Sequence, residues 1–281
     1  MASVPRHFHF VFGLHEQTAP LHLIHYLCLE SCRVVNAPDA IHLHVRHEPF
    51  GPLWDRIRPH LVLHSIGAQP SDYDRTCYAA SEEGRLIAHL GLDYAHEADF
   101  IRLDALIEHG GVYADMDTLF VRPYPAAWYD EEFLIGEEAP TLRSGALIRP
   151  SLCNAVMFSR PRSRFAQAWR ERMGEAFDGS WSRHSCDAAG ALWGQLPEAV
   201  RVMPEEYFYA FPCTRHGLKA LLQEAQPLPE SAFSLHLWAH LWWARERTDF
   251  TAVHAGMFDL HTLRNVDCTY NVVARRFIDG L

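Results

Sequence analysis

The sequence contains almost no lysine and no surplus of positive charge. Lys219 is the only lysine among 281 residues, and 25 basic residues stand against 35 acidic ones, so the formal net charge is −10. A non-specific nucleic-acid binder needs clustered Lys and Arg to neutralise phosphates. We therefore exclude nucleic acid as a partner.

Long hydrophobic runs are also missing. No stretch approaches the ~18 consecutive apolar residues that a membrane-spanning helix requires. Met1–His15 lacks the charged-then-apolar pattern of a signal peptide, because His7 and His9 interrupt its short hydrophobic stretch. These absences predict a soluble, cytoplasmic protein with no transmembrane segment, and they leave peripheral contact with a membrane open.

Cysteine is scattered, and several metal-binding and catalytic signatures are absent. The seven cysteines contain no Cys-x-x-Cys pair, so we predict free thiols rather than a disulfide framework. The sequence has no His-Glu-x-x-His motif and no Cys/His zinc spacing, which argues against a zinc site. It also has no Gly-x-Ser-x-Gly motif, so a serine hydrolase gains no support.

What is present is the composition of a globular protein, with 48% hydrophobic and 12% aromatic residues. Hydrophobic periodicity predicts strands at His7–Phe12, Ala40–Val45, Leu61–His64, Val112–Ala114, Asn154–Ser159 and Ala232–Leu237. It predicts helices at Leu21–Cys32, Trp54–Ile57, Glu97–His109, Ser163–Glu175 and Cys186–Leu192. The alternation of strands and helices in the first half predicts the α/β class, with a mainly parallel sheet covered by helices.

The strongest local signal is an Asp-x-Asp pair, Asp115 and Asp117, at the end of the strand that follows Gly110-Gly111. In an extended backbone residues i and i+2 point to the same side, so both carboxylates are expected to face one cavity. Two adjacent carboxylates repel unless a cation lies between them, and Mg²⁺ or Mn²⁺ held in this way binds substrate phosphates. The pattern alone is weak, because Asp72-Tyr73-Asp74 matches it in a polar stretch that reads as a loop or helix cap.

Asp99 and Arg102 lie three residues apart on the preceding helix, so their side chains project from the same side. Arg102 could hydrogen-bond a sugar or phosphate oxygen while Asp99 accepts hydroxyl protons. The spacing fits an exposed ion pair of little energetic weight equally well. The residues alone leave both interpretations open.

The run Ala98–Asp117 resembles the sugar-binding region of the glycosyltransferases that contain an Asp-x-Asp motif. These are the family 32 type of enzyme, related to the α1,4-galactosyltransferases and the clostridial glucosylating toxins. Shorter segments agree with this resemblance over roughly residues 7 to 245. They are His9–Gly13, Gly51–Trp54, Asn154–Met157 and His236–Trp238.

The resemblance implies a single GT-A domain over residues 1–281, with a nucleotide-sugar half at about 1–125 and an acceptor-side half at about 126–281. It implies a nucleotide-sugar donor, most simply a UDP-sugar, with Mn²⁺ or Mg²⁺ as the cofactor. The hexose would pass with retention of anomeric configuration to a hydroxyl acceptor, a glycan or a glycolipid. Electrostatic stabilisation of the leaving diphosphate would then be the main catalytic contribution.

The same resemblance implies roles for individual residues. Asp117 would bind the metal directly, and Asp115 would hold the ribose or a water-bridged metal. Together with Arg102, these aspartates are the catalytic candidates. Residues expected to contact the donor are Asp99, Arg102, Tyr113 and Asn154.

Phe12, Trp238 and His236 are three further candidates, and each has a structural explanation beside the functional one. Phe12 is a substitute for the aromatic residue that stacks on the base, but as alternating strand residues both Phe10 and Phe12 are more simply core packing. Trp238 belongs to a tryptophan cluster with Trp242 and Trp243, which is either core or a sugar-stacking platform.

His236 is the candidate for a third metal ligand, and an imidazole ligand would favour Mn²⁺ over Mg²⁺. Its alternative role is a histidine hydrogen-bonded inside the tryptophan cluster. A ligand must be neutral, so activity is expected to fall as the pH drops through ~6.5. Trp181 and His184 are weaker candidates on the acceptor side.

Two rival functions use the same residues. One is a metal-dependent hydrolase of nucleotide sugars, which needs no acceptor. The other is a catalytically inactive carbohydrate-binding module on the same scaffold. The intact Asp-x-Asp pair argues against the second rival.

Overall fold

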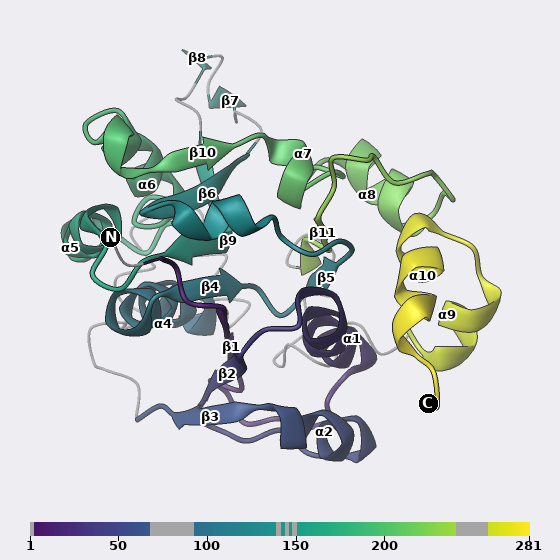
Figure 1. The fold of residues 1–281 in the computed structure, drawn as a ribbon. Helices are drawn as coiled ribbons and strands as arrows, with labels where there is room; N and C mark the ends of the chain where they lie inside the picture. The colour runs from purple at the N-terminus through teal and green to yellow at the C-terminus, as the bar shows by residue number, and fades with distance from the viewer. Residues whose placement is uncertain (1–2, 68–92, 139–141, 144–145, 148–150, 240–257) are drawn as a thin grey trace.

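A seven-stranded sheet crosses the molecule in the order β10-β6-β9-β4-β1-β2-β3, and β9 runs antiparallel to both of its neighbours while the other strands share one direction (Figure 1). The computed structural model describes residues 3–67, 93–138, 142–143, 146–147, 151–239 and 258–281. The sheet consists of β1 (His7–Phe12), β2 (Ala40–Val45), β3 (Val62–Ser65), β4 (Gly111–Ala114), β6 (Phe133–Glu138), β9 (Ser151–Ser159) and β10 (Arg201–Met203). The predicted α/β class with a mainly parallel sheet is confirmed.

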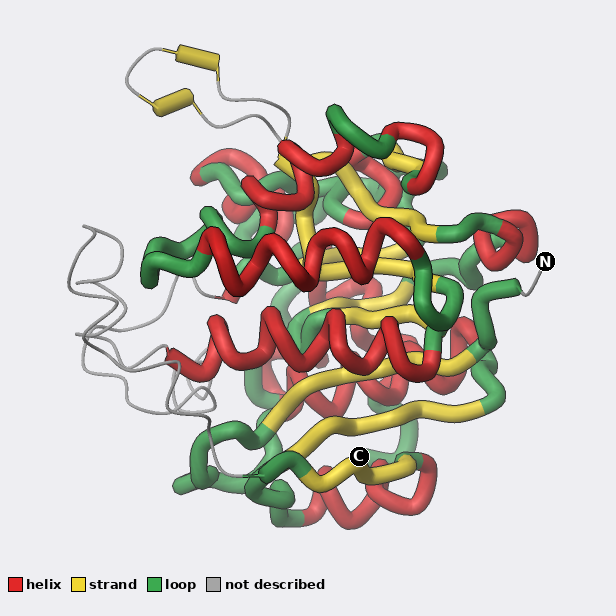
Figure 2. The backbone as a smooth tube through the Cα atoms, turned by 90° about the vertical axis from the view of Figure 1, so that its left-hand side faces the viewer, coloured by secondary structure: helices red, strands yellow, loops and turns green. Residues whose placement is uncertain are grey.

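Helices cover both faces of the sheet. On one face α4 (Asp93–His109) and α5 (Arg164–Ala176) lie side by side, as Figure 2 shows, and α6 (Cys186–Trp193) packs against α5. The other helices are α1 (Leu23–Ser31), α2 (Pro52–Ile57), α7 (Glu205–Phe208), α8 (Arg215–Leu222), α9 (Leu260–Asn265) and α10 (Thr269–Ala274). The positions of the helices predicted from periodicity are confirmed to within a few residues, and α4 already includes Asp93, four residues before its expected start.

Alternation along β1 gives the sheet a hydrophobic core on each face. Phe8, Phe10 and Phe12 point into the core that α1 covers, whereas Val11 joins the core formed with α4, α5 and α6. The prediction that Phe10 packs in the core is therefore confirmed, because its side chain is fully buried.

A second, two-stranded sheet joins distant parts of the chain. β5 (Thr118–Phe120) pairs antiparallel with β11 (Ser234–His236), and the register places His236 opposite Thr118. The sequence pattern predicted β11 within Ala232–Leu237 but not β5, whose three residues are too few for a periodic signal. This pairing carries a C-terminal histidine to the Asp-x-Asp pair. A further short pair, β7 (Leu142–Arg143) and β8 (Ala146–Leu147), follows β6.

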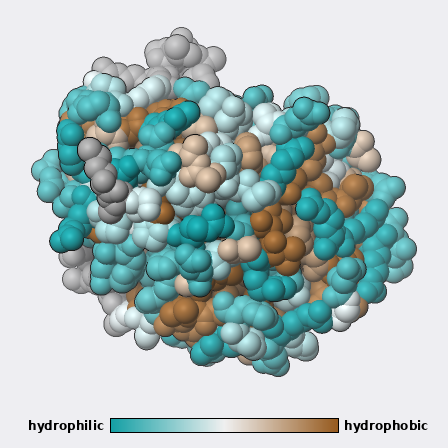
Figure 3. Space-filling model, in the orientation of Figure 1, coloured by the Kyte–Doolittle hydropathy of each residue, from teal (hydrophilic) through white to brown (hydrophobic). Residues whose placement is uncertain are grey.

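Several sequence-level expectations concern surface and chemistry rather than topology. Cys28, Cys32, Cys153, Cys186, Cys213 and Cys268 are free thiols, as predicted. Within the described ranges, no helix combines the length and apolarity needed to cross a membrane. The visible face is mainly hydrophilic, with hydrophobic residues in separate areas (Figure 3). Asp72-Tyr73-Asp74, Cys77, Trp242 and Trp243 lie outside the described residues.

Candidate active site

One pocket opens where β1 and β4 end, beside the first turns of α4. Nine of the site residues that the sequence singled out line this pocket: Phe12, Asp99, Arg102, Tyr113, Asp115, Asp117, Asn154, His236 and Trp238. Trp181 also lines it. Segments that are far apart in the chain therefore come together in one site.

The Asp-x-Asp pair lies in a tight turn between β4 and β5. The Thr118 amide donates to the Asp115 carbonyl over 3.0 Å, which closes the turn. From α1, Nδ1 of His25 lies 3.0 Å from the Met116 carbonyl oxygen, and the Cys28 thiol donates to the Asp115 carbonyl over 3.5 Å. The expectation of an extended backbone was wrong here. The carboxylates share one cavity because the chain reverses direction at Asp115–Thr118, not because strand side chains alternate.

Asp115, Asp117 and His236 form a cluster that fits a divalent cation. Nε2 of His236 lies 2.9 Å from Oδ1 of Asp117 and 3.7 Å from Oδ2 of Asp115. One potential ligand atom from each residue lies within 4.8 Å of the others. Two carboxylate oxygens and one imidazole nitrogen are a suitable donor set for Mn²⁺ and, less well, for Mg²⁺.

The surroundings of His236 favour its protonated, positively charged form. Burial alone lowers the pKa of His236, but Asp117 and the contacts with Asp115 outweigh it and raise the pKa to about 10. The protonated ring thus places a positive charge beside the two neighbouring carboxylates.

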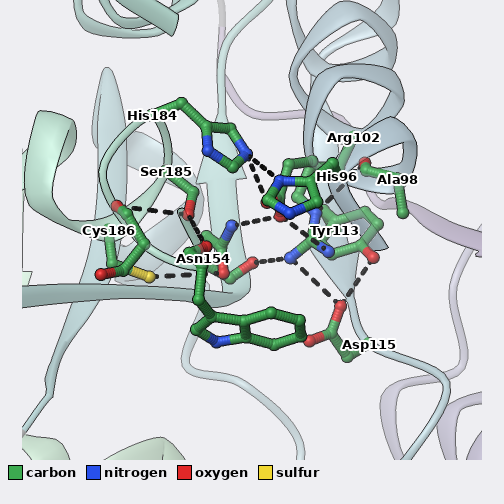
Figure 4. Close-up of polar contacts among 12 residues, drawn as sticks. His96, Ala98, Arg102, Tyr113, Asp115, Asn154, His184, Ser185 and Cys186 are labelled. Atoms are coloured by element: carbon green, nitrogen blue, oxygen red, sulfur yellow. Dashed lines mark hydrogen bonds and ion pairs between the residues drawn. The ribbon is translucent and has the colours of Figure 1, made fainter. Parts of the chain in front are cut away.

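Arg102 links the cluster of Asp115, Asp117 and His236 to the neighbouring part of the pocket (Figure 4). Its guanidinium lies 3.2 Å from Asp99 and 3.2 Å from Asp115, and it donates to the Asn154 carbonyl over 2.9 Å. It also stacks 4.6 Å above the Tyr113 ring, whose hydroxyl donates to Asp115 over 2.7 Å. Because Arg102 is only 6% exposed, the interpretation as an exposed ion pair was wrong.

Asp99 is held by Asn154 and His184 besides Arg102, and His96 in turn contacts His184. The Asn154 side-chain amide donates to its Oδ1 over 2.7 Å, and Nε2 of His184 lies 3.0 Å from its Oδ2. Nδ1 of His96 lies 3.2 Å from that same His184 nitrogen. Burial raises the pKa of Asp99, but Arg102 and then His184 outweigh it and hold the pKa below its usual value. Asp99 therefore stays ionised with its orientation fixed.

His96, Asp99 and His184 also lie close enough together to hold a metal. Their single carboxylate already pairs with Arg102, so this group has less need of a cation than the cluster with two aspartates. His184 was predicted on the acceptor side, whereas the structure buries it completely against Asp99. His96 was missed, and no sequence signal marks it, because its role depends on a loop that follows α5.

Phe12 and Trp238 are both buried at the edge of the pocket. The Phe12 ring packs 4.6 Å from that of His25. The Trp238 indole donates to the Phe211 carbonyl over 2.8 Å, and its ring lies 4.3 Å from that of His236. At 2% exposure, Trp238 offers no open stacking platform and instead positions His236.

Comparison with known proteins shows which family the chain resembles. Residues 36–134 match the family described as glycosyltransferase sugar-binding region containing DXD motif, which confirms the resemblance found in the sequence. A curated relative, Glucan organizing enzyme 1 of Cryptococcus neoformans var. grubii serotype A (strain H99), is 34% identical over 212 residues. The match covers 73% of this chain and 54% of the relative, so the chain spans about half of that protein's length.

Two solved structures are distantly similar. The PaToxG glycosyltransferase has a TM-score of 0.47 at 14% identity, covering 70% of this chain and 71% of that one. Galactosyltransferase LgtC in complex with donor and acceptor sugar analogs has a TM-score of 0.44 at 13% identity, covering 90% of this chain and 97% of that one.

Proposed function

We propose that the chain is a metal-dependent, retaining glycosyltransferase, because residues 36–134 match the family described as glycosyltransferase sugar-binding region containing DXD motif. It moves a hexose from a nucleotide sugar, most simply a UDP-sugar, to a hydroxyl group of a glycan or glycolipid. The name of the relative, Glucan organizing enzyme 1, refers to glucan, which is consistent with a glycan acceptor.

The observation that carries this proposal is the convergence of two charge clusters in one pocket. Asp115, Asp117 and His236 form a cation site, and Arg102 links it directly to Asp99. A diphosphate and the sugar attached to it need these two environments side by side. We propose that Asp115, Asp117 and His236 hold Mn²⁺ or Mg²⁺, which when bound neutralises charge on the leaving diphosphate.

The chain's own residues orient the donor. Asp99 accepts hydrogen bonds from sugar hydroxyls, and its two oxygens are already directed by Asn154 and His184. Arg102 donates to an oxygen of the sugar or of the phosphate next to it, while Tyr113 supports the guanidinium from below. Because these groups are buried and mutually bonded before the substrate arrives, little reorganisation accompanies the reaction.

A donor assay tests the proposal. The purified protein is incubated with Mn²⁺ and, separately, with UDP-glucose, UDP-galactose, UDP-N-acetylglucosamine and GDP-mannose, and release of the nucleoside diphosphate is followed. We expect slow hydrolysis of one donor, acceleration by an added sugar acceptor, and loss of turnover with EDTA or in Asp117→Ala. Asp104→Ala, which removes an exposed carboxylate of α4, is the matched control and should keep full activity.

Other outcomes separate the rivals. Efficient hydrolysis that no acceptor accelerates would identify a nucleotide-sugar hydrolase. Sugar binding without turnover would identify a carbohydrate-binding module. Near wild-type transfer by Asp117→Ala would show that the metal assignment is wrong.

A further inference from the structure

Glu138 is a carboxylate that lines the same pocket, and it has no role in the reaction proposed above. It is the last residue of β6, and its backbone pairs with Ser151 of β9. β6 and β4 flank β9 on opposite sides and run in the same direction, so Glu138 and Asp115 both stand at carboxyl ends of strands. Ligands bind at this edge of α/β sheets.

One strand, β9, lies between the two strands that end at these carboxylates. Neighbouring strands are ~4.8 Å apart, so β4 and β6 are separated by about 10 Å across β9. Cys153 and Asn154 of β9 also line the pocket. The wall of the pocket that holds the Asp115, Asp117 and His236 cluster therefore also includes Asn154 and Glu138.

Glu138 differs from the other carboxylates of the pocket in its partners. Asp99 and Asp115 contact Arg102, and Asp117 contacts His236. The contacts found for Glu138 among the described residues are neutral: the Ser151 hydroxyl donates over 3.1 Å and the Cys213 thiol over 3.8 Å. Burial raises the pKa of Glu138, and Ser151 and His236 only partly oppose this.

A carboxylate can accept about four hydrogen bonds, and a thiol is a weak donor, so Glu138 retains acceptor capacity toward the pocket. A buried polar group is stable when donors satisfy it. Sugar hydroxyls are donors of the required kind and size. From this placement and these contacts, we propose that Glu138 is a sugar-binding residue that accepts hydrogen bonds from hydroxyl groups of the donor hexose or of the acceptor sugar.

This inference rests on the proposed function, and calorimetry tests it with the full chain in Mn²⁺. The variant is Glu138→Gln, which keeps the shape of the side chain and removes its charge. Glu137→Gln is the matched control, because Glu137 is adjacent on β6, points to the opposite side of the strand and does not line the pocket. The probes are UDP, UDP-glucose and UDP-galactose.

We expect Glu138→Gln to bind UDP as the wild type does and to bind the UDP-hexose at least tenfold more weakly, if the contact is to the donor. If the contact is to the acceptor, donor affinity is unchanged and the KM for an added acceptor sugar rises at least tenfold while donor hydrolysis persists. Glu138→Asp, which keeps the charge but shortens the side chain, is measured in parallel and should show the same selective loss if Glu138→Gln does not fold.

Two results would overturn the inference alone: wild-type behaviour of Glu138→Gln with both sugars, or an equal loss of affinity for UDP and UDP-hexose. A wild-type protein that neither binds nor turns over any UDP-hexose would overturn the proposed function, and the inference with it. The two failures are therefore distinguishable by the wild-type measurement.

Discussion

Arg102 is the residue on which both halves of the site depend, because its guanidinium contacts Asp99 and Asp115 simultaneously. Removing it deprives the buried Asp99 and the partly buried Asp115 of their contact with the guanidinium. We expect Arg102→Ala to lower the free energy of unfolding by about 3–5 kcal/mol. Arg170→Ala, which breaks the more exposed pair with Asp104, should lower it by no more than about 1 kcal/mol. Urea unfolding of both variants gives the comparison.

The same variant tests which part of the substrate Arg102 touches. In calorimetry with Mn²⁺, Arg102→Ala should lose affinity for the UDP-sugar while largely keeping affinity for UDP. A large loss of UDP affinity would instead assign Arg102 to the phosphates.

His236 makes metal binding depend on pH, because its raised pKa of about 10 keeps the ring protonated in the metal-free protein. A ligand nitrogen must give up that proton, so Mn²⁺ affinity should rise about tenfold per pH unit between pH 6.5 and 8.5. Calorimetry in buffers of different ionisation enthalpy should detect about one proton released per Mn²⁺. In His236→Gln the pH dependence should disappear. Mn²⁺ affinity that is constant over this range in the wild type would remove His236 from the metal site.

At the scale of elements, the junction of α4 and β4 places the site residues of both. Gly110 and Gly111 have φ values of 65° and 111°. A Cβ on Gly111 would lie 2.6 Å from the His7 carbonyl oxygen, and one on Gly110 would lie 2.5 Å from Pro161. Gly111→Ala should therefore destabilise the protein by at least about 2 kcal/mol. Gly174→Ala in α5 meets no neighbour and should stabilise it by roughly 0.5–1 kcal/mol. Thermal unfolding of the two variants should move in opposite directions.

Histidines share one face of the parallel strands β1, β2 and β3. The register places His9 beside His42, and His44 beside His64. Nε2 of His9 must donate to the Gly110 carbonyl at 2.9 Å, so its Nδ1 accepts from Nε2 of His44 at 3.1 Å. Burial first, and neighbouring histidines second, lower the pKa of His9 to about 2 and that of His44 to about 3. These rings are neutral and hydrogen-bonded when the protein is folded.

Acid should therefore destabilise these strands. Because the folded pKa values of His9 and His44 are depressed, their contribution is complete above pH 6.5 and is lost as the pH falls below it. Each ring should remove about 1.4 kcal/mol of stability per pH unit below this point. In urea unfolding between pH 7 and pH 5, the free energy of unfolding of His44→Gln should fall by about 2 kcal/mol less than that of the wild type. His261→Gln, on the exposed surface of α9, should leave the slope unchanged.

The elements that the sequence predicted well are those in which a periodic pattern and a stop signal coincide. β1 and β2 have the predicted ends, and α4 stops at Gly110 as expected. The Asp-x-Asp turn and β5 could not be predicted in this way, because pairing with β11 defines them. His96 and Glu138 could not be predicted from the sequence either, since their surroundings come from loops and strands with no fixed sequence spacing. The resemblance, not periodicity, brought Asn154 and His236 into the predicted site.

At the scale of the whole molecule, the cluster of Asp115, Asp117 and His236 joins two parts of the chain that are far apart in the sequence. Its residues come from the β4–β5 turn and from β11, which belong to the nucleotide-sugar and acceptor-side halves predicted from the sequence. The Leu237 amide donates to the Asp117 carbonyl over 3.1 Å, and the Ala239 amide donates to the Asp117 carboxylate over 3.0 Å. Any ligand that binds only this assembled arrangement stabilises the entire folded chain.

Manganese should therefore raise the melting temperature of the 281-residue chain. At a free concentration of 100 times its Kd, a single ion adds about 2.7 kcal/mol, which corresponds to a rise of about 5–10 °C for a chain of this size. EDTA should reverse the rise, and His236→Ala should reduce it because the C-terminal ligand is lost. Asp104→Ala, whose carboxylate lies on the exposed side of α4, should keep the full shift. A rise of equal size in His236→Ala would mean that the ion bridges only Asp115 and Asp117, and that the pairing of β5 with β11 holds the halves together without help from a metal.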